Sequence, residues 1–155
     1  MDAAEIRQAA PDDAPAIARL VDEAYSPYIP RMGRKPAPML DDYRQVLAEA
    51  DAFVCTCDGE VAGVLVLRPQ GPALLLENIA VAPAFKGQGI GKALLAFCEE
   101  RARAQGFQAI ELYTNQLMTE NIALYTKLGY RETHRATENG FARVFMRKVV
   151  AGPAL

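Results

Sequence analysis

Apolar and polar residues follow a short repeat in several parts of the chain, and this pattern predicts strands rather than long helices. We expect strands at residues 5–9, 52–57, 61–68, 74–82, 108–114, 130–137 and 142–149. Asp58-Gly59 lies between the second and third of these runs, and Glu138-Asn139-Gly140 lies between the last two. Both sequences favour tight turns, so each predicts an antiparallel hairpin.

Other segments space their apolar residues three or four apart, which is typical of an amphipathic helix. We expect one helix to begin at Pro11-Asp12-Asp13, and others at residues 40–49, 90–105 and 119–128. The inward-facing residues are Ile17, Leu20, Val21, Tyr43, Val46, Leu47, Ile90, Leu94, Phe97 and Cys98. Residues 26–38 contain four prolines and cannot form a regular helix.

The order of these elements predicts an α/β fold with a mixed sheet. Strands come first, strands linked by helices follow, and a hairpin ends the chain, so helices should cover both faces of the sheet. The chain has 155 residues, enough for one well-buried core. No repeat, low-complexity tract or long linker divides it, so we expect a single domain over residues 1–155.

Composition and charge exclude several kinds of partner. The net charge is −2 and 23% of the residues are charged, which does not favour a nucleic-acid or membrane surface. No apolar run is long enough to cross a membrane, and the acidic N-terminus does not resemble a signal peptide. We therefore expect a soluble protein of the cytoplasm.

The three cysteines do not predict a disulfide or a metal site. Cys55 and Cys57 lie two apart on one expected strand, and the chain has a single histidine, His134. No second cysteine pair accompanies them, so a zinc site is not indicated. We expect free thiols in a reducing compartment, with no metal.

The glycine-rich stretch Lys86-Gly87-Gln88-Gly89-Ile90-Gly91-Lys92 is the clearest functional signal. It follows an expected strand and opens an expected helix, where backbone amides lack partners and the helix dipole favours an anion. A tight turn with nothing bound is the alternative. The stretch fails the P-loop pattern, which needs Gly at Lys86 and Ser or Thr at Ala93, and it fails the dinucleotide fingerprint at Lys92.

With these patterns excluded, the loop resembles that of the GNAT superfamily of N-acetyltransferases, which binds the pyrophosphate of acetyl-coenzyme A. Asn78-Ile79-Ala80-Val81-Ala82-Pro83 is similar to the family's fourth strand, and residues 121–130 are similar to its later helix, which ends at Gly129 before Tyr130. Lys86 stands where the family usually has Arg or Gln. Met118 stands where it has Asn, and Asn121 where Ala is common.

The resemblance implies a cofactor site and a reaction. The fourth and fifth strands should separate, and the pantetheine arm should pair with the backbone of Ile79, Ala80 and Val81. The resemblance places the pyrophosphate on residues 86–92 and Asn121 near the cofactor. It also implies direct transfer of an acetyl group to a primary amine, with Tyr125 as the acid that protonates the leaving thiolate.

The base for this reaction has more than one candidate. Glu77 lies in an otherwise apolar strand, and such surroundings favour a carboxylate that takes up a proton near neutral pH. A position on a polar sheet edge is the alternative for Glu77, and Glu111 on the next strand is the competing base. His134 lies between two arginines late in the chain and fits an exposed strand residue better.

The acceptor is expected at residues 24–31, where Tyr25, Tyr28 and Arg31 offer aromatic and charged contacts. In the family this segment often covers the substrate cleft; a stiff surface loop is the alternative. Many proteins of this fold form homodimers. There are two competing functions: a non-catalytic acyl-CoA-binding module of the same fold, and a nucleotide-binding protein.

Overall fold

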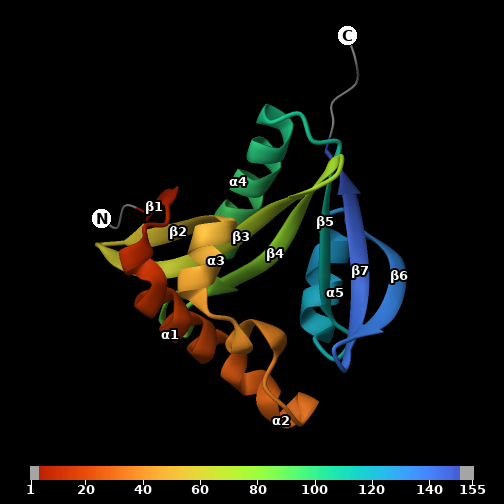
Figure 1. The fold of residues 1–155 in the computed structure, drawn as a ribbon, viewed down its shortest axis with the longest axis horizontal. Coiled ribbons are helices and arrows are strands. Elements are labelled where there is room, and N and C mark those ends of the chain that lie inside the picture. Colours follow the sequence, from red (N-terminus) through yellow and green to blue (C-terminus); the bar gives the residue numbers. More distant parts are fainter. Residues whose placement is uncertain (1–3, 151–155) are drawn as a thin grey trace. The chain divides into compact units, whose positions relative to one another are not determined.

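The computed structural model describes residues 4–150, whose seven strands follow the sheet order β1-β2-β3-β4-β5-β7-β6 (Figure 1). The strands are β1 (Ala4–Gln8), β2 (Asp51–Cys57), β3 (Glu60–Gln70), β4 (Ala73–Val81), β5 (Ala109–Asn115), β6 (Arg131–Glu138) and β7 (Phe141–Val149). β4 and β5 are parallel, whereas β1–β2, β2–β3, β5–β7 and β6–β7 are antiparallel. This mixed sheet confirms the predicted fold class, and every strand lies within two residues of its predicted range.

The chain divides into two compact units, which we describe separately. The first comprises residues up to Arg68 together with Asn78–Phe97. The second comprises Pro69–Glu77 and the residues from Cys98 onward. The expectation of a single domain over residues 1–155 stays a prediction.

The first unit buries residues on both faces of its strands. On one face, helices α1 (Ala14–Tyr25) and α3 (Tyr43–Glu49) lie side by side (Figure 1) and share a core with Val54, Val64 and Val66. On the other face, the start of α4 (Ile90–Ala104) packs on β2 and β3, where the rings of Phe53 and Phe97 are 4.8 Å apart. Helices on both faces are therefore present within this unit, as predicted.

The segment between α1 and α3 differs from the prediction in detail. The proline-rich stretch contains no long helix, but it folds into short helical turns: Ser26–Tyr28, α2 (Ile29–Met32) and Ala37–Leu40. The predicted helix over 40–49 begins only at Tyr43, because Asp41 is extended and the Asp42 carboxylate caps the helix by accepting from the Arg44 amide.

The second unit is built on the pairing of β5 with its neighbours. β4 pairs with β5 from Ala73–Ala109 to Leu76–Leu112, and β7 pairs along the whole of β5. Helix α5 (Thr119–Lys127) ends before Gly129, and the buried rings of Tyr125 and Tyr130 meet edge to face at 5.6 Å. The separation of the fourth and fifth strands that the resemblance implies stays a prediction.

Both predicted hairpin turns are present. Asp58 and Gly59 have φ values of 52° and 82°, and Asn139 and Gly140 have φ values of 53° and 79°. Two successive residues with positive φ match the twist of the strands that they join, which explains why Asp-Gly and Asn-Gly occupy these positions.

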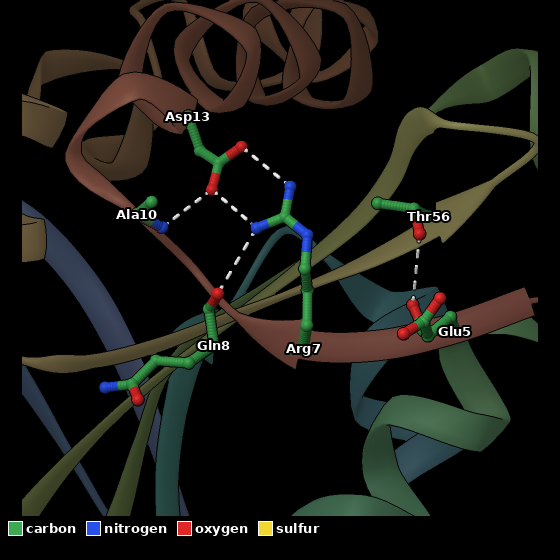
Figure 2. Close-up of polar contacts among 6 residues, drawn as sticks. All are labelled: Glu5, Arg7, Gln8, Ala10, Asp13 and Thr56. Carbon is green, nitrogen blue, oxygen red and sulfur yellow. Dashed lines mark hydrogen bonds and ion pairs between the residues drawn. The ribbon is translucent and has the colours of Figure 1, made fainter.

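A polar cluster joins β1 to the start of α1 (Figure 2). Arg7 donates from Nη1 and Nη2 to the two carboxylate oxygens of Asp13, at 2.8 and 3.0 Å. The Ala10 amide donates to the same carboxylate at 2.7 Å. The Arg7 hydrogen bonds, supported by the Ala10 amide, hold the pKa of Asp13 below its ordinary value.

Candidate active site

The glycine-rich loop leaves a row of backbone donors at the start of α4. The first backbone hydrogen bond of this helix runs from the Ala93 amide to the Gly89 carbonyl, at 2.9 Å. Within residues 4–150, the amides of residues 87–92 have no backbone acceptor. Residues 86–89 are exposed, so this part of the loop is accessible to a ligand.

Glycine is required in this loop by its backbone conformation. Gly87 and Gly89 have φ values of 82° and 80°, which side chains rarely adopt. A Cβ atom added at either residue would meet nothing within 4 Å, so packing does not demand glycine there. The loop lies at the positive end of a 15-residue helix, which suits a phosphate or pyrophosphate.

The loop lies against the end of β4. A Cβ atom on Gly91 would be 3.5 Å from the Cγ2 atom of Val81. Ile79 and Val81 are half-buried, while Ala80 between them is buried in the core with α1 and α3. The structure thus brings together the cofactor residues predicted on β4 and those predicted on the loop.

Lys86 and Lys92 supply positive charge at the loop. Both side chains are exposed, and neither forms an ion pair within the part of the chain that the structure describes. Lysines so placed can neutralise a bound polyphosphate without first giving up another partner.

The predicted acceptor residues lie in the same unit as the loop. The Tyr25 hydroxyl donates to the Asn78 side-chain oxygen at 2.8 Å and approaches the Ile79 carbonyl at 3.2 Å. The Tyr25 and Tyr28 ring centroids are 6.4 Å apart, and the Arg31 guanidinium lies 5.1 Å from the Tyr28 ring. Tyr25 therefore touches the strand predicted to bind the cofactor.

Asn78 is a buried polar residue whose partners the sequence did not indicate. It is 5% exposed on the face of β4 that packs toward α1 and α3. It accepts from Tyr25 and donates from Nδ2 to the Tyr43 hydroxyl at 3.1 Å. The available signal was an amide at a position where the strand pattern calls for an apolar side chain.

The predicted acid and base lie in the second unit. Tyr125 is 7% exposed on α5, and Glu77 is half-buried near the end of β4. Asn121 donates to the Met118 sulfur at 3.6 Å, so this amide is already engaged. That these residues form one site with the glycine loop stays a prediction.

The competing bases have partners within the second unit. Glu111 accepts from the Gln70 amide at 2.7 Å and lies 3.6 Å from Arg147. His134 is exposed, and its ring stacks on Phe145 with centroids 4.3 Å apart. Both competing candidates therefore contact neighbouring side chains of the second unit.

The cysteines are buried free thiols, as predicted. Burial raises the pKa of Cys98 to about 12, so this thiol is not a nucleophile near neutral pH. Burial also raises the pKa of the Tyr130 phenol, which lies beside Tyr125. Among residues 4–150 there is no cluster of three side chains able to hold a metal ion.

The model of the "Acetyltransferase (GNAT) family" matches residues 15–130. This match includes the glycine loop and the later stretch that ends at Tyr130. The chain belongs to the GNAT acetyltransferase family. It is therefore an acetyltransferase, and the acyl donor of this family is acetyl-coenzyme A.

Individual relatives agree with this assignment. The acetyltransferase is 32% identical over 127 residues to the "uncharacterized N-acetyltransferase YjgM" of Escherichia coli, covering 76% of each chain. It is 31% identical over 144 residues to the aminoglycoside N(6')-acetyltransferase type 1 of Stenotrophomonas maltophilia, covering 84% of this chain and 88% of the relative.

A solved structure shows the same fold. The PaiA N-acetyltransferase of Thermoplasma acidophilum, crystallised with coenzyme A, superposes with a TM-score of 0.77 at 16% identity. The superposition covers 95% of this chain and 99% of the other.

No helix within residues 4–150 is both long and apolar enough to cross a membrane.

Proposed function

We propose that this acetyltransferase binds acetyl-coenzyme A through the amides of residues 87–92 and transfers the acetyl group directly to a primary amine. The row of unpaired amides at the start of α4 is the observation that carries the proposal. Those donors, with Lys86 and Lys92 beside them, fit a pyrophosphate, whose oxygens accept several hydrogen bonds at once.

The rest of the proposed cofactor site is a strand edge. The backbone of Ile79 and Val81 would pair with the amide groups of the pantetheine arm, because both residues lie on the half-buried side of β4. When bound, the cofactor supplies an activated acetyl thioester. The chain needs no nucleophile of its own for direct transfer, in keeping with the inert thiol of Cys98.

Two side chains would move protons in this reaction. Glu77, directly or through a water, would take the proton from the attacking amine, and Tyr125 Oη would give its proton to the departing sulfur. Glu77 is the proposed base because it lies on β4, two residues before Ile79, where the pantetheine arm is proposed to pair.

The acceptor class and the cellular setting are also proposals. Tyr28 provides an aromatic ring and Arg31 a positive charge beside it, which suits an amine that also carries acidic or hydroxyl groups. The S. maltophilia relative, named for aminoglycoside acetylation, makes an aminoglycoside a sensible first acceptor. Buried free thiols support a cytoplasmic location. A homodimer is the proposed assembly, and light scattering would test it.

The proposal is tested by an acceptor panel. Release of coenzyme A from acetyl-coenzyme A is measured with an aminoglycoside, a polyamine, an amino acid and a peptide with a free N-terminus, and products are identified by mass spectrometry. We expect amine-dependent release and a mass increase of one acetyl group. Tight cofactor binding without transfer to any amine, including proteins of a lysate, would favour a non-catalytic acyl-CoA-binding module instead.

A further inference from the structure

Three polar side chains from distant parts of the chain meet inside the first unit. Tyr25 ends α1, Tyr43 begins α3, and Asn78 lies on β4 between them. Tyr43 and Asn78 are each 5% exposed. Buried polar groups are costly unless every one is paired, so the pairing within this cluster determines which arrangement of these segments is stable.

The hydrogen bonds run in one direction through the cluster. The Tyr25 hydroxyl donates to Asn78 Oδ1 at 2.8 Å, and Asn78 Nδ2 donates to the Tyr43 hydroxyl at 3.1 Å. The Tyr43 hydroxyl in turn donates to the Pro38 carbonyl at 2.6 Å. Asn78 must therefore accept on one side and donate on the other, which an amide does and a carboxylate does not.

The cluster spans the segment proposed to contact the acceptor. Tyr25 directly precedes the proline-rich residues 26–38, Tyr43 follows them, and Pro38 lies within them. These residues form only short helical turns. The cluster fixes both ends of the segment to the same strand position.

That strand position adjoins the proposed cofactor edge. The Tyr25 hydroxyl lies 3.2 Å from the Ile79 carbonyl, and Ile79 is the first of the residues proposed to pair with the pantetheine arm. A shift of Asn78 would therefore change where the acceptor segment lies relative to the backbone that presents the acetyl group.

We propose that Asn78 is a positioning residue that holds residues 26–42 against β4 and thereby sets the affinity for the amine acceptor. It acts through Tyr25 and Tyr43 and does not itself touch the reactants. This inference rests on the proposed function, because it assumes that residues 26–38 contact the acceptor.

The test compares Asn78→Asp with Asn139→Asp, which makes the same change at an exposed hairpin turn. Hydrogen exchange is followed in peptides covering residues 26–42 and in a reference peptide from α4. We expect exchange over 26–42 to become about tenfold faster in Asn78→Asp alone, with the α4 peptide unchanged. Equal exchange over 26–42 in the wild type and Asn78→Asp, or an equal acceleration in α4, would overturn the inference.

A kinetic readout separates positioning from general damage to the fold. With an amine that the wild type acetylates, Asn78→Asp should raise the acceptor KM about tenfold and leave the acetyl-coenzyme A KM within about twofold. An equal rise in both KM values would contradict a positioning role. If the wild type did not bind acetyl-coenzyme A, the proposed function would be contradicted. The hydrogen-exchange comparison would still decide whether Asn78 holds residues 26–42.

Tyr43→Phe provides a second variant should Asn78→Asp fail to fold. It keeps the amide of Asn78 and removes the hydroxyl that receives it and that reaches Pro38. Tyr113→Phe, on β5, is its matched control. The same acceleration over 26–42 and the same rise in acceptor KM are expected, and wild-type behaviour in both measurements would overturn the inference.

Discussion

Asp13 shows how one side chain fixes the start of a helix to the strand before it. Its carboxylate accepts two hydrogen bonds from Arg7 and one from the Ala10 amide (Figure 2). The pKa of Asp13 is lower in the folded chain than its ordinary value, chiefly because of the Arg7 hydrogen bonds. Its stabilising effect is therefore complete above the pKa of the unfolded chain and is lost as the pH falls through the folded-state pKa.

Asp13→Asn should lower the free energy of unfolding by about 1 kcal/mol at pH 7, since the pair is partly exposed and screened by solvent. The difference from the wild type should begin to shrink once the pH falls below the pKa of Asp13 in the unfolded chain, because the unfolded state then takes up a proton that the folded pair resists. Urea unfolding at pH 7 and pH 3 measures this, with Asp12→Asn as the exposed neighbouring control. A difference that is the same at both pH values would refute the assignment.

Gly89→Val should weaken acetyl-coenzyme A binding about 100-fold, through loss of amide donors to the pyrophosphate. A branched side chain at a φ value of 80° is strained and would redirect the loop. Gly71→Val is the matched control, because Gly71 also has positive φ with open space around it. Calorimetric titration of both variants is the measurement; equal affinities in the two would remove the loop from the cofactor site.

Tyr125→Phe should reduce kcat about 10²- to 10⁴-fold while leaving cofactor affinity unchanged, because only the proton donor is lost. Tyr113→Phe serves as the comparison variant. Steady-state coenzyme A release gives kcat, and titration gives the affinity. A variant with wild-type turnover would show that the Tyr125 hydroxyl serves packing rather than proton transfer.

At the residue scale, the sequence predicted the glycine-rich loop, but it did not predict which side chains pair with one another. Gly87 and Gly89 could be recognised because a loop with positive φ values favours glycine. The pairing of Glu111 with Gln70 and Arg147, and of Asn78 with two tyrosines, could not, because each partner is more than 30 residues away along the chain. Such pairings depend on strand register, which a local pattern does not specify.

At the scale of elements, the packing of α4 on the sheet depends on a glycine. A Cβ atom added to Gly63 on β3 would lie 2.9 Å from Ile90 Cγ2 and 2.9 Å from Leu94 Cδ1. Leu94 is completely buried. The helix that carries the glycine loop therefore lies as close to β3 as the absence of a side chain allows.

Gly63→Ala should destabilise the fold by about 1–3 kcal/mol, because the added methyl group overpacks this contact. Leu94→Ala alone should cost about 2–5 kcal/mol through the cavity it leaves. In the double variant the methyl group gains space, so the two costs should not add. Chemical unfolding of the four proteins completes the cycle, and strict additivity would argue against the close contact.

The type and order of the helices and strands were predictable because the spacing of apolar residues and the positions of turn-forming residues agree along most of the chain. Asp58-Gly59 and Asn139-Gly140 adopt the positive φ values that their composition favours. The start of α3 was predicted three residues early, because apolar periodicity continues through Leu40 while the cap at Asp42 begins the helix. Capping, rather than hydrophobic pattern, decided that boundary.

At the scale of the whole molecule, the family assignment links features that lie in different units. The matched residues 15–130 include both the glycine loop and Tyr125. The sequence predicted the strands and their antiparallel hairpins. The parallel pairing of β4 with β5 is a long-range contact that a local pattern does not specify. Only the resemblance implied that the pantetheine arm of the cofactor binds at these two strands.

Binding of acetyl-coenzyme A is the most direct test of the account. Melting temperatures are measured with acetyl-coenzyme A, coenzyme A, ATP and NAD in parallel. A ligand at 100 times its Kd stabilises the native state by about 2.7 kcal/mol, so we predict a rise of several degrees with both coenzyme A forms and none with ATP or NAD. No rise with coenzyme A, or a larger rise with ATP or NAD, would contradict an acetyl-coenzyme A site at residues 86–92.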